Sequence, residues 1–104
     1  MISYFDLVNN LSVNPRDIIT NPLNHRSGKW FYAYTDKGQI FVTVAKEHLP
    51  KCSISTPRVL LEKEFEDIYK LYLLRKQGHS VSQKAAEVTR NQVYWYGIFN
   101  DINY

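Results

Sequence analysis

The chain has 104 residues and a formal net charge of +3, a length typical of one domain with one hydrophobic core. Only four Gly and four Pro occur, which excludes a collagen-like or low-complexity chain. The 44% of hydrophobic and 22% of charged residues are ordinary for a globular protein, whereas 14% of aromatic residues is high. We therefore expect a single domain over residues 1–104.

The excess positive charge lies in the middle of the chain. Residues 26–58 contain six Lys or Arg against two Asp or Glu. Such an excess attracts phosphate backbones when it forms one face, but it is also common on a solvated surface. Composition alone leaves both interpretations open.

Three features bear on the cellular compartment. Cys52 is the only cysteine, so no disulfide can form within the chain, and a reducing environment is expected. Residues 1–6 lack the basic and apolar segments of a signal peptide. The apolar runs are much shorter than a membrane span. These features predict a cytoplasmic protein without a membrane partner.

Two helix-start signals open the chain. Ser3 followed by Asp6 is typical of a capping box and predicts a short helix through Leu11. Residues 14–17, Asn-Pro-Arg-Asp, repeat the signal with a cap, a first-turn proline and an acid. They predict a second helical turn that buries Ile18 and Ile19.

The strongest local pattern is a β-hairpin. Residues 29–35 and 39–45 are runs of aromatic and β-branched residues, and residues 36–38, Asp-Lys-Gly, supply the turn. Neither strand has a fully polar face. The hairpin therefore needs cover on both sides, from helices or from a second subunit.

The C-terminal half reads as helical. Residues 51–56 form a loop or one short extra strand, and Pro57 then begins a long helix that Gly78 ends. Ser80 begins a final helix to about Phe99. The predicted fold class is α+β, with an N-terminal helix, a central antiparallel hairpin and two long C-terminal helices that form an antiparallel helical hairpin.

Two helices joined by a short Gly-containing turn are also the layout of DNA-binding helix-turn-helix units. Lys84, Arg90 and Asn91 would lie on the outer face of the final helix, and Arg and Asn suit guanine and adenine edges. However, Glu87 would face phosphate, and the segment reads as one capped helix. We therefore favour a packed helix pair and keep DNA binding as an alternative.

Aromatic residues cluster near the C-terminus. They can fill the core, form a subunit interface or stack on unpaired bases. Neighbouring rings cannot all face one core across a helix, so we predict a homodimer interface made of Tyr94, Trp95, Tyr96 and Phe99. The alternating rings of the first hairpin strand, beside Arg26 and Lys29, are a second candidate for stacking on bases: Trp30, Tyr32 and Tyr34.

Catalytic motifs are absent from the sequence pattern. The three histidines lack metal-ligand spacing, and no phosphate-binding glycine motif occurs, so neither a metal nor a cofactor is expected. His25 is the single candidate for proton transfer, with Arg26 and Lys29 for phosphate contact. A nonspecific nucleic-acid patch would centre on Arg26, Lys29 and Lys46, with Trp30 stacking on a base.

As a class, the chain resembles the small orphan proteins carried by integron cassettes, prophages and similar mobile elements. The resemblance consists of shortness, aromatic content and the lack of a catalytic signature, and it transfers no residue role. We predict a non-enzymatic, self-associating binding or regulatory module. The alternatives are a nucleic-acid-binding protein, through the C-terminal helices or the basic hairpin face, and a small nucleic-acid-processing enzyme.

Overall fold

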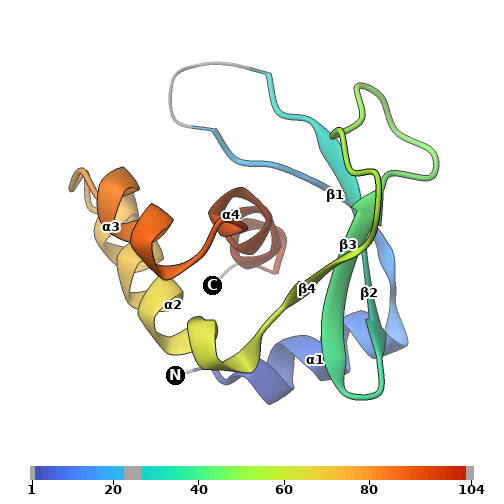
Figure 1. Cartoon of the computed structure of the whole chain (residues 1–104), viewed down its shortest axis with the longest axis horizontal. Coiled ribbons are helices and arrows are strands. Elements are labelled where there is room, and N and C mark those ends of the chain that lie inside the picture. Colours follow the sequence, from blue (N-terminus) through green and yellow to red (C-terminus); the bar gives the residue numbers. More distant parts are fainter. Residues whose placement is uncertain (1, 23–26, 103–104) are drawn as a thin grey trace.

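The computed structural model describes residues 2–22 and 27–102. In chain order the elements are α1 (Tyr4–Val13), β1 (Arg16–Ile19), β2 (Trp30–Asp36), β3 (Gln39–Val44), β4 (Arg58–Leu60), α2 (Glu62–Lys76), α3 (Ser82–Val88) and α4 (Gln92–Asp101). The strands form one antiparallel sheet in the order β1-β2-β3-β4. Figure 1 shows α4 beside the sheet, α2 and α3 beyond α4, and α1 along the lower end of the sheet. The α+β class is confirmed.

The N-terminal helix begins with the predicted capping box. The Ser3 hydroxyl accepts a hydrogen bond from the Asp6 backbone, and the Asp6 carboxylate accepts one from the Ser3 backbone. The apolar face that the spacing predicts is buried, namely Tyr4, Leu7, Val8 and Leu11. Because α1 packs on β2 and β3, this face closes one end of the core.

The central hairpin is also confirmed. Asp36 pairs with Gln39, which leaves a two-residue turn. Both turn residues have positive φ, 52° at Lys37 and 77° at Gly38, as expected for the turn that matches strand twist. The local sequence is sufficient to specify this hairpin.

The predicted second helical turn is wrong, because residues 16–19 form β1. Ile18 is fully buried and pairs with Phe31, whereas Ile19, also expected to be buried, is 37% exposed. The Asn-Pro start signal favours a helix locally, but two consecutive β-branched residues fit a strand. The pairing with β2 overrides the helix signal and adds an edge to the sheet.

The predicted start of the long helix is also wrong. The residues after Pro57 form β4, in which Val59 pairs with Phe41 and Leu60 pairs with Ile40. Within the expected loop or extra strand of residues 51–56, only Lys51 forms a bridge, to Trp30. The helix therefore begins at Glu62 instead. Burial of Leu60 at 0% exposure explains why the strand wins.

The final segment forms two helices rather than one, so the predicted antiparallel pair of long helices is replaced by three helices. Thr89 breaks the helix with extended backbone, φ −158° and ψ 150°. Its side-chain oxygen accepts a hydrogen bond from the Asn91 backbone at 3.0 Å. Thr89 is 5% exposed, so this turn is part of the packed structure.

Gly97 allows α4 to approach the sheet closely. A Cβ atom at this position would lie 3.0 Å from the Ile19 carbonyl oxygen and 3.0 Å from the Phe31 ring. Although glycine weakens a helix interior, α4 continues past Gly97 to Asp101. The glycine instead lets α4 lie directly against β1 and β2.

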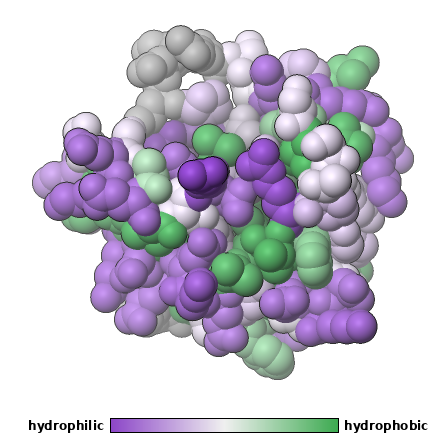
Figure 2. Space-filling model, viewed as in Figure 1, coloured by the Kyte–Doolittle hydropathy of each residue, from purple (hydrophilic) through white to green (hydrophobic). Residues whose placement is uncertain are grey.

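The surface agrees with this layering. Figure 2 shows hydrophobic residues near the centre of the viewed face, over the region between α4 and β4, with hydrophilic residues around them. Among the described residues, no helix combines the length and apolar character that a membrane span requires.

Candidate functional site

The two faces of the sheet differ in their cover. The inner face carries the fully buried side chains of the sheet, namely Ile18, Phe31, Ala33, Ile40, Val42 and Leu60, all at 0% exposure. Helices α2, α3 and α4 lie on this side (Figure 1). The outer face carries four partly exposed rings, which we call the ring platform: Trp30, Tyr32, Tyr34 and Phe41. The hairpin was expected to need cover on both faces. The helices of this chain cover the inner face, and the outer face keeps partly exposed rings.

Three rings of the platform, Tyr32, Tyr34 and Phe41, form a continuous row. The centroids of Tyr32 and Tyr34 lie 5.9 Å apart, and those of Tyr34 and Phe41 lie 5.6 Å apart with planes inclined by 19°. Tyr34 and Phe41 are directly opposite across the β2–β3 ladder. Period-2 alternation puts the three platform rings of β2 on one face, and the hairpin register brings Phe41 beside them.

Two side chains from the segment after β3 lie over the platform. The Lys46 ammonium is 4.2 Å from the centroid of the Tyr32 ring, a cation–π contact. The His48 ring stacks on Trp30 at 4.0 Å with an interplanar angle of 20°. A positive charge and a second flat ring therefore belong to this face.

The platform borders a grooved surface. One hollow of about 470 Å³ is lined by Tyr32, Tyr34 and Lys46 together with Pro15. A second hollow of about 320 Å³ shares Pro15, Tyr32 and Lys46, and continues to His48. Both hollows therefore extend from Pro15, just before the start of β1, to Tyr32 of β2.

Asp17 holds the segment that carries Lys46 and His48. Its carboxylate accepts backbone hydrogen bonds from residues 46, 47 and 48 at 2.8–3.0 Å. The Nδ1 atom of His48 lies 2.9 Å from the same carboxylate, whose side chain is 3% exposed. Burial alone raises the pKa of the Asp17 carboxyl, but the hydrogen bonds from His48 and the backbone outweigh it and hold the pKa well below its usual range.

The predicted nucleic-acid residues of the hairpin separate into two places. Trp30 and Lys46 belong to the outer face. Lys29 lines a different pocket with Cys52. Arg26 and the catalytic candidate His25 lie outside the described residues. The predicted patch is therefore reduced, for the described residues, to Lys46 and Trp30. They lie beside the predicted stacking rings Tyr32 and Tyr34, and the fold adds Phe41, His48 and Asp17.

The helix-turn-helix alternative meets a steric obstacle. A short break does separate α3 from α4, as such a unit requires. However, six consecutive residues of α4, Tyr94–Phe99, are buried, so this helix cannot enter a DNA groove. Lys84 is exposed on α3, Arg90 is exposed in the turn, and Asn91 accepts a hydrogen bond from Arg58 at 3.3 Å. These three residues do not form the face of a recognition helix.

The four rings predicted to form a dimer interface lie in the core of the single chain. Trp95 and Phe99 are 0% exposed, and Tyr94 and Tyr96 are 7% exposed. Trp95 stacks on Phe99 at 5.7 Å, and Tyr94 meets Phe31 edge-on at 5.1 Å. The turn at Thr89 and the position of α4 between sheet and helices explain how one core receives all four. These rings therefore offer no exposed surface to a second copy.

Two buried tyrosines make opposite predictions for stability. The Tyr96 hydroxyl is buried without a hydrogen-bond partner in the described structure, whereas the Tyr4 hydroxyl donates to the Leu60 carbonyl at 2.6 Å and accepts from the Ile40 N–H at 3.0 Å. Tyr96→Phe should leave the free energy of unfolding unchanged or raise it by about 1 kcal/mol, and Tyr4→Phe should lower it by about 1–2 kcal/mol. Urea unfolding measures both. An equal loss in the two variants contradicts the assignment.

Metal-site geometry is not found within residues 2–22 and 27–102, where no three His, Cys, Asp or Glu side chains gather. Cys52 is free and 9% exposed. Burial raises the pKa of its thiol, and the nearby charge of Lys29 opposes this only in part. Such a thiol is a weak nucleophile at neutral pH.

Comparison with protein-family models, with curated proteins and with solved structures finds no significant match.

Proposed function

We propose that the protein is a non-enzymatic binding module that holds single-stranded nucleic acid on the ring platform. The observation that carries the proposal is the row of partly exposed rings on the outer sheet face, Tyr32, Tyr34 and Phe41, with Lys46 over Tyr32. Unpaired bases stack on such rings whatever their identity, because every base has a π-face. The expected binding is accordingly tolerant of sequence.

Charge supports a polyanion rather than a second copy as the occupant. A symmetric dimer through this face would be isologous and would bring two copies of Lys46 into one apolar interface. Taking these ammonium groups out of water is costly even with an acid such as Glu47 in the same hollow, because desolvation can exceed the gain of an ion pair. A phosphate backbone instead supplies the opposite charge along its whole length. We therefore place self-association, the sequence-based expectation, second.

The geometry favours single strands over duplexes. The buried α4 cannot act as a recognition helix, and a stacking surface needs bases that are free of their partners. The sheet provides rings from two adjacent strands for this purpose.

Fluorescence anisotropy with labelled DNA and RNA of about 15 nucleotides, at about 50 mM salt, tests the proposal. We expect binding of single strands and weaker binding of the matching duplex. The logarithm of the affinity should fall linearly with the logarithm of the salt concentration, with a slope of about −0.7 for each phosphate contacted. Lys46→Gln should reduce this slope. Lys70→Gln is the control, because Lys70 is 65% exposed on α2, away from the platform.

Light scattering of the same samples separates the two occupants. A monomer that binds single strands supports the proposal. A dimer that Tyr34→Ala dissociates, together with no binding of either nucleic acid at about 50 mM salt, would assign the ring platform to self-association instead.

A further inference from the structure

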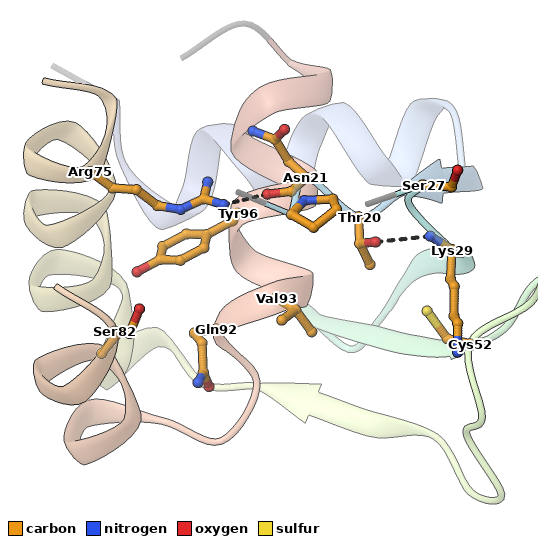
Figure 3. A pocket seen from close by; sticks show the side chains of 12 residues that line it. Thr20, Asn21, Ser27, Lys29, Cys52, Arg75, Ser82, Gln92, Val93 and Tyr96 are labelled. Atoms are coloured by element: carbon orange, nitrogen blue, oxygen red, sulfur yellow. Dashed lines mark hydrogen bonds between the residues drawn. The ribbon is translucent and has the colours of Figure 1, made fainter. Parts of the chain in front are cut away.

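A further cavity, separate from the two hollows beside the ring platform, lies on the helical side of the molecule. Its volume is about 450 Å³, within the usual range for small-molecule sites. Figure 3 shows it between α2, α3 and α4 on one side and the backbone around Thr20 and Lys29 on the other. It shares no lining residue with the ring platform. Its apolar lining includes Pro22, Ala85 and Val93.

The polar lining favours an anion. Among the described lining residues two are basic, Lys29 and Arg75, and none is acidic. Arg75 reaches from α2 across the Tyr96 ring, with its guanidinium carbon 4.6 Å from the ring centroid. One of its nitrogens donates to the Asn21 carbonyl. A guanidinium has five N–H donors, so this contact uses a part of its capacity.

A buried donor provides an independent observation. Tyr96 is 7% exposed, and its hydroxyl has no hydrogen-bond partner in the described structure. In Figure 3 this hydroxyl and the Ser82 side chain point toward one another below Arg75. A buried polar group without a partner costs stability, so its presence needs a reason. A ligand oxygen that accepts from this hydroxyl supplies one.

We propose that this cavity binds a small organic anion, with its acidic group on Arg75 and Tyr96 and its apolar body against Pro22 and Val93. The shared chemistry is a planar or tetrahedral oxyanion, as in a carboxylate or a phosphate monoester, to which arginine donates paired hydrogen bonds. Lys29 adds a second positive charge at the other end of the cavity in Figure 3. The inference is independent of nucleic-acid binding.

Nuclear magnetic resonance with three named probes tests it. Benzoate and phenyl phosphate carry the two kinds of acidic group, and benzyl alcohol carries the same ring without charge. We expect both anions to shift the methyl resonances of Ala85 and Val93 with saturable, weak affinity, and benzyl alcohol to bind at least about tenfold more weakly. The anion that binds more tightly shows whether the cavity prefers a carboxylate or a phosphate monoester.

Arg75→Gln should lower the affinity for the preferred anion at least about tenfold. Lys70→Gln, on the same helix, is the control and should bind the anion like the wild type. Because Arg75 also contacts Asn21, the dispersion of the amide spectrum checks that the variant is folded. Tyr96→Phe keeps Arg75 and should weaken the anion roughly threefold. The inference is overturned when benzyl alcohol binds as well as benzoate, or when Tyr96→Phe and a folded Arg75→Gln both bind like the wild type.

Discussion

Replacing Asp17 by alanine is expected to lower the free energy of unfolding by about 3 kcal/mol, because hydrogen bonds to a charged group contribute about 1.5–3 kcal/mol each. The carboxylate accepts three backbone hydrogen bonds and lies 2.9 Å from the His48 ring. Urea unfolding at neutral pH measures the loss. The replacement should also release Lys46 and His48 from the ring platform and thereby weaken nucleic-acid binding.

The same residue predicts a pH dependence with a definite sign. The folded-state pKa of Asp17 is lowered from its ordinary value, so its contribution is complete above the unfolded-state pKa of about 4. The contribution decreases as the pH falls below that value toward the folded-state pKa. The stability difference between the wild type and Asp17→Ala should therefore shrink in acid and stay constant above about pH 5.

Asp67→Ala is the matched control, because Asp67 is an exposed acid on α2. It should change the free energy of unfolding by less than about 0.5 kcal/mol. If Asp17→Ala changes the free energy of unfolding as little as Asp67→Ala does, the Asp17 carboxylate does not hold residues 46–48 in place. A stability difference that grows in acid would contradict the assigned sign.

The largest effect on binding is expected from the double variant Trp30→Ala with Tyr34→Ala. Stacking of a base on an aromatic side chain contributes about 1–3 kcal/mol. Two lost rings therefore predict a loss of about 2–6 kcal/mol, which is at least about a thirtyfold loss of single-strand affinity. Fluorescence anisotropy at low salt measures it, with unfolding curves to show that the variant remains folded.

Phe5→Ala is the control for this pair. Phe5 is 67% exposed on α1, so the variant removes an exposed ring that lies outside the platform. The affinity of Phe5→Ala for single strands should equal that of the wild type. A loss in Phe5→Ala comparable to that in the double variant would mean that the rings act nonspecifically.

The sequence predicts the elements whose causes are local. The hairpin follows from alternating β-branched and aromatic residues around a turn with two positive φ angles. The first helix follows from its capping box. Trp30, Tyr32 and Tyr34 share a face by alternation alone, so most of the ring platform is predictable from residues 29–35.

The missed elements depend on distant partners. Residues 16–19 carry a helix-start signal, yet they form β1 because Ile18 pairs with Phe31 in the core. Asp17 looks like a first-turn acid, and nothing near it in the sequence indicates that it accepts hydrogen bonds from residues 46–48.

The aromatic C-terminus illustrates a different limit. The periodicity of one long helix indicates surplus rings that must face outward. The break at Thr89 and the close approach at Gly97 instead place α4 between the sheet and α2, where neighbours surround it on several sides. Neither the break nor its effect on burial follows from helical spacing.

Tryptophan fluorescence tests the central claim, that the outer sheet face binds single-stranded nucleic acid, most directly. The chain has two tryptophans: Trp30 is partly exposed on the ring platform, and Trp95 is 0% exposed in the core. Titration with a single-stranded oligonucleotide should quench the wild type when a base takes the place of His48 on the Trp30 ring. It should leave Trp30→Phe almost unchanged. Equal quenching in both proteins, or none in the wild type at a concentration at which anisotropy reports binding, would contradict the claim.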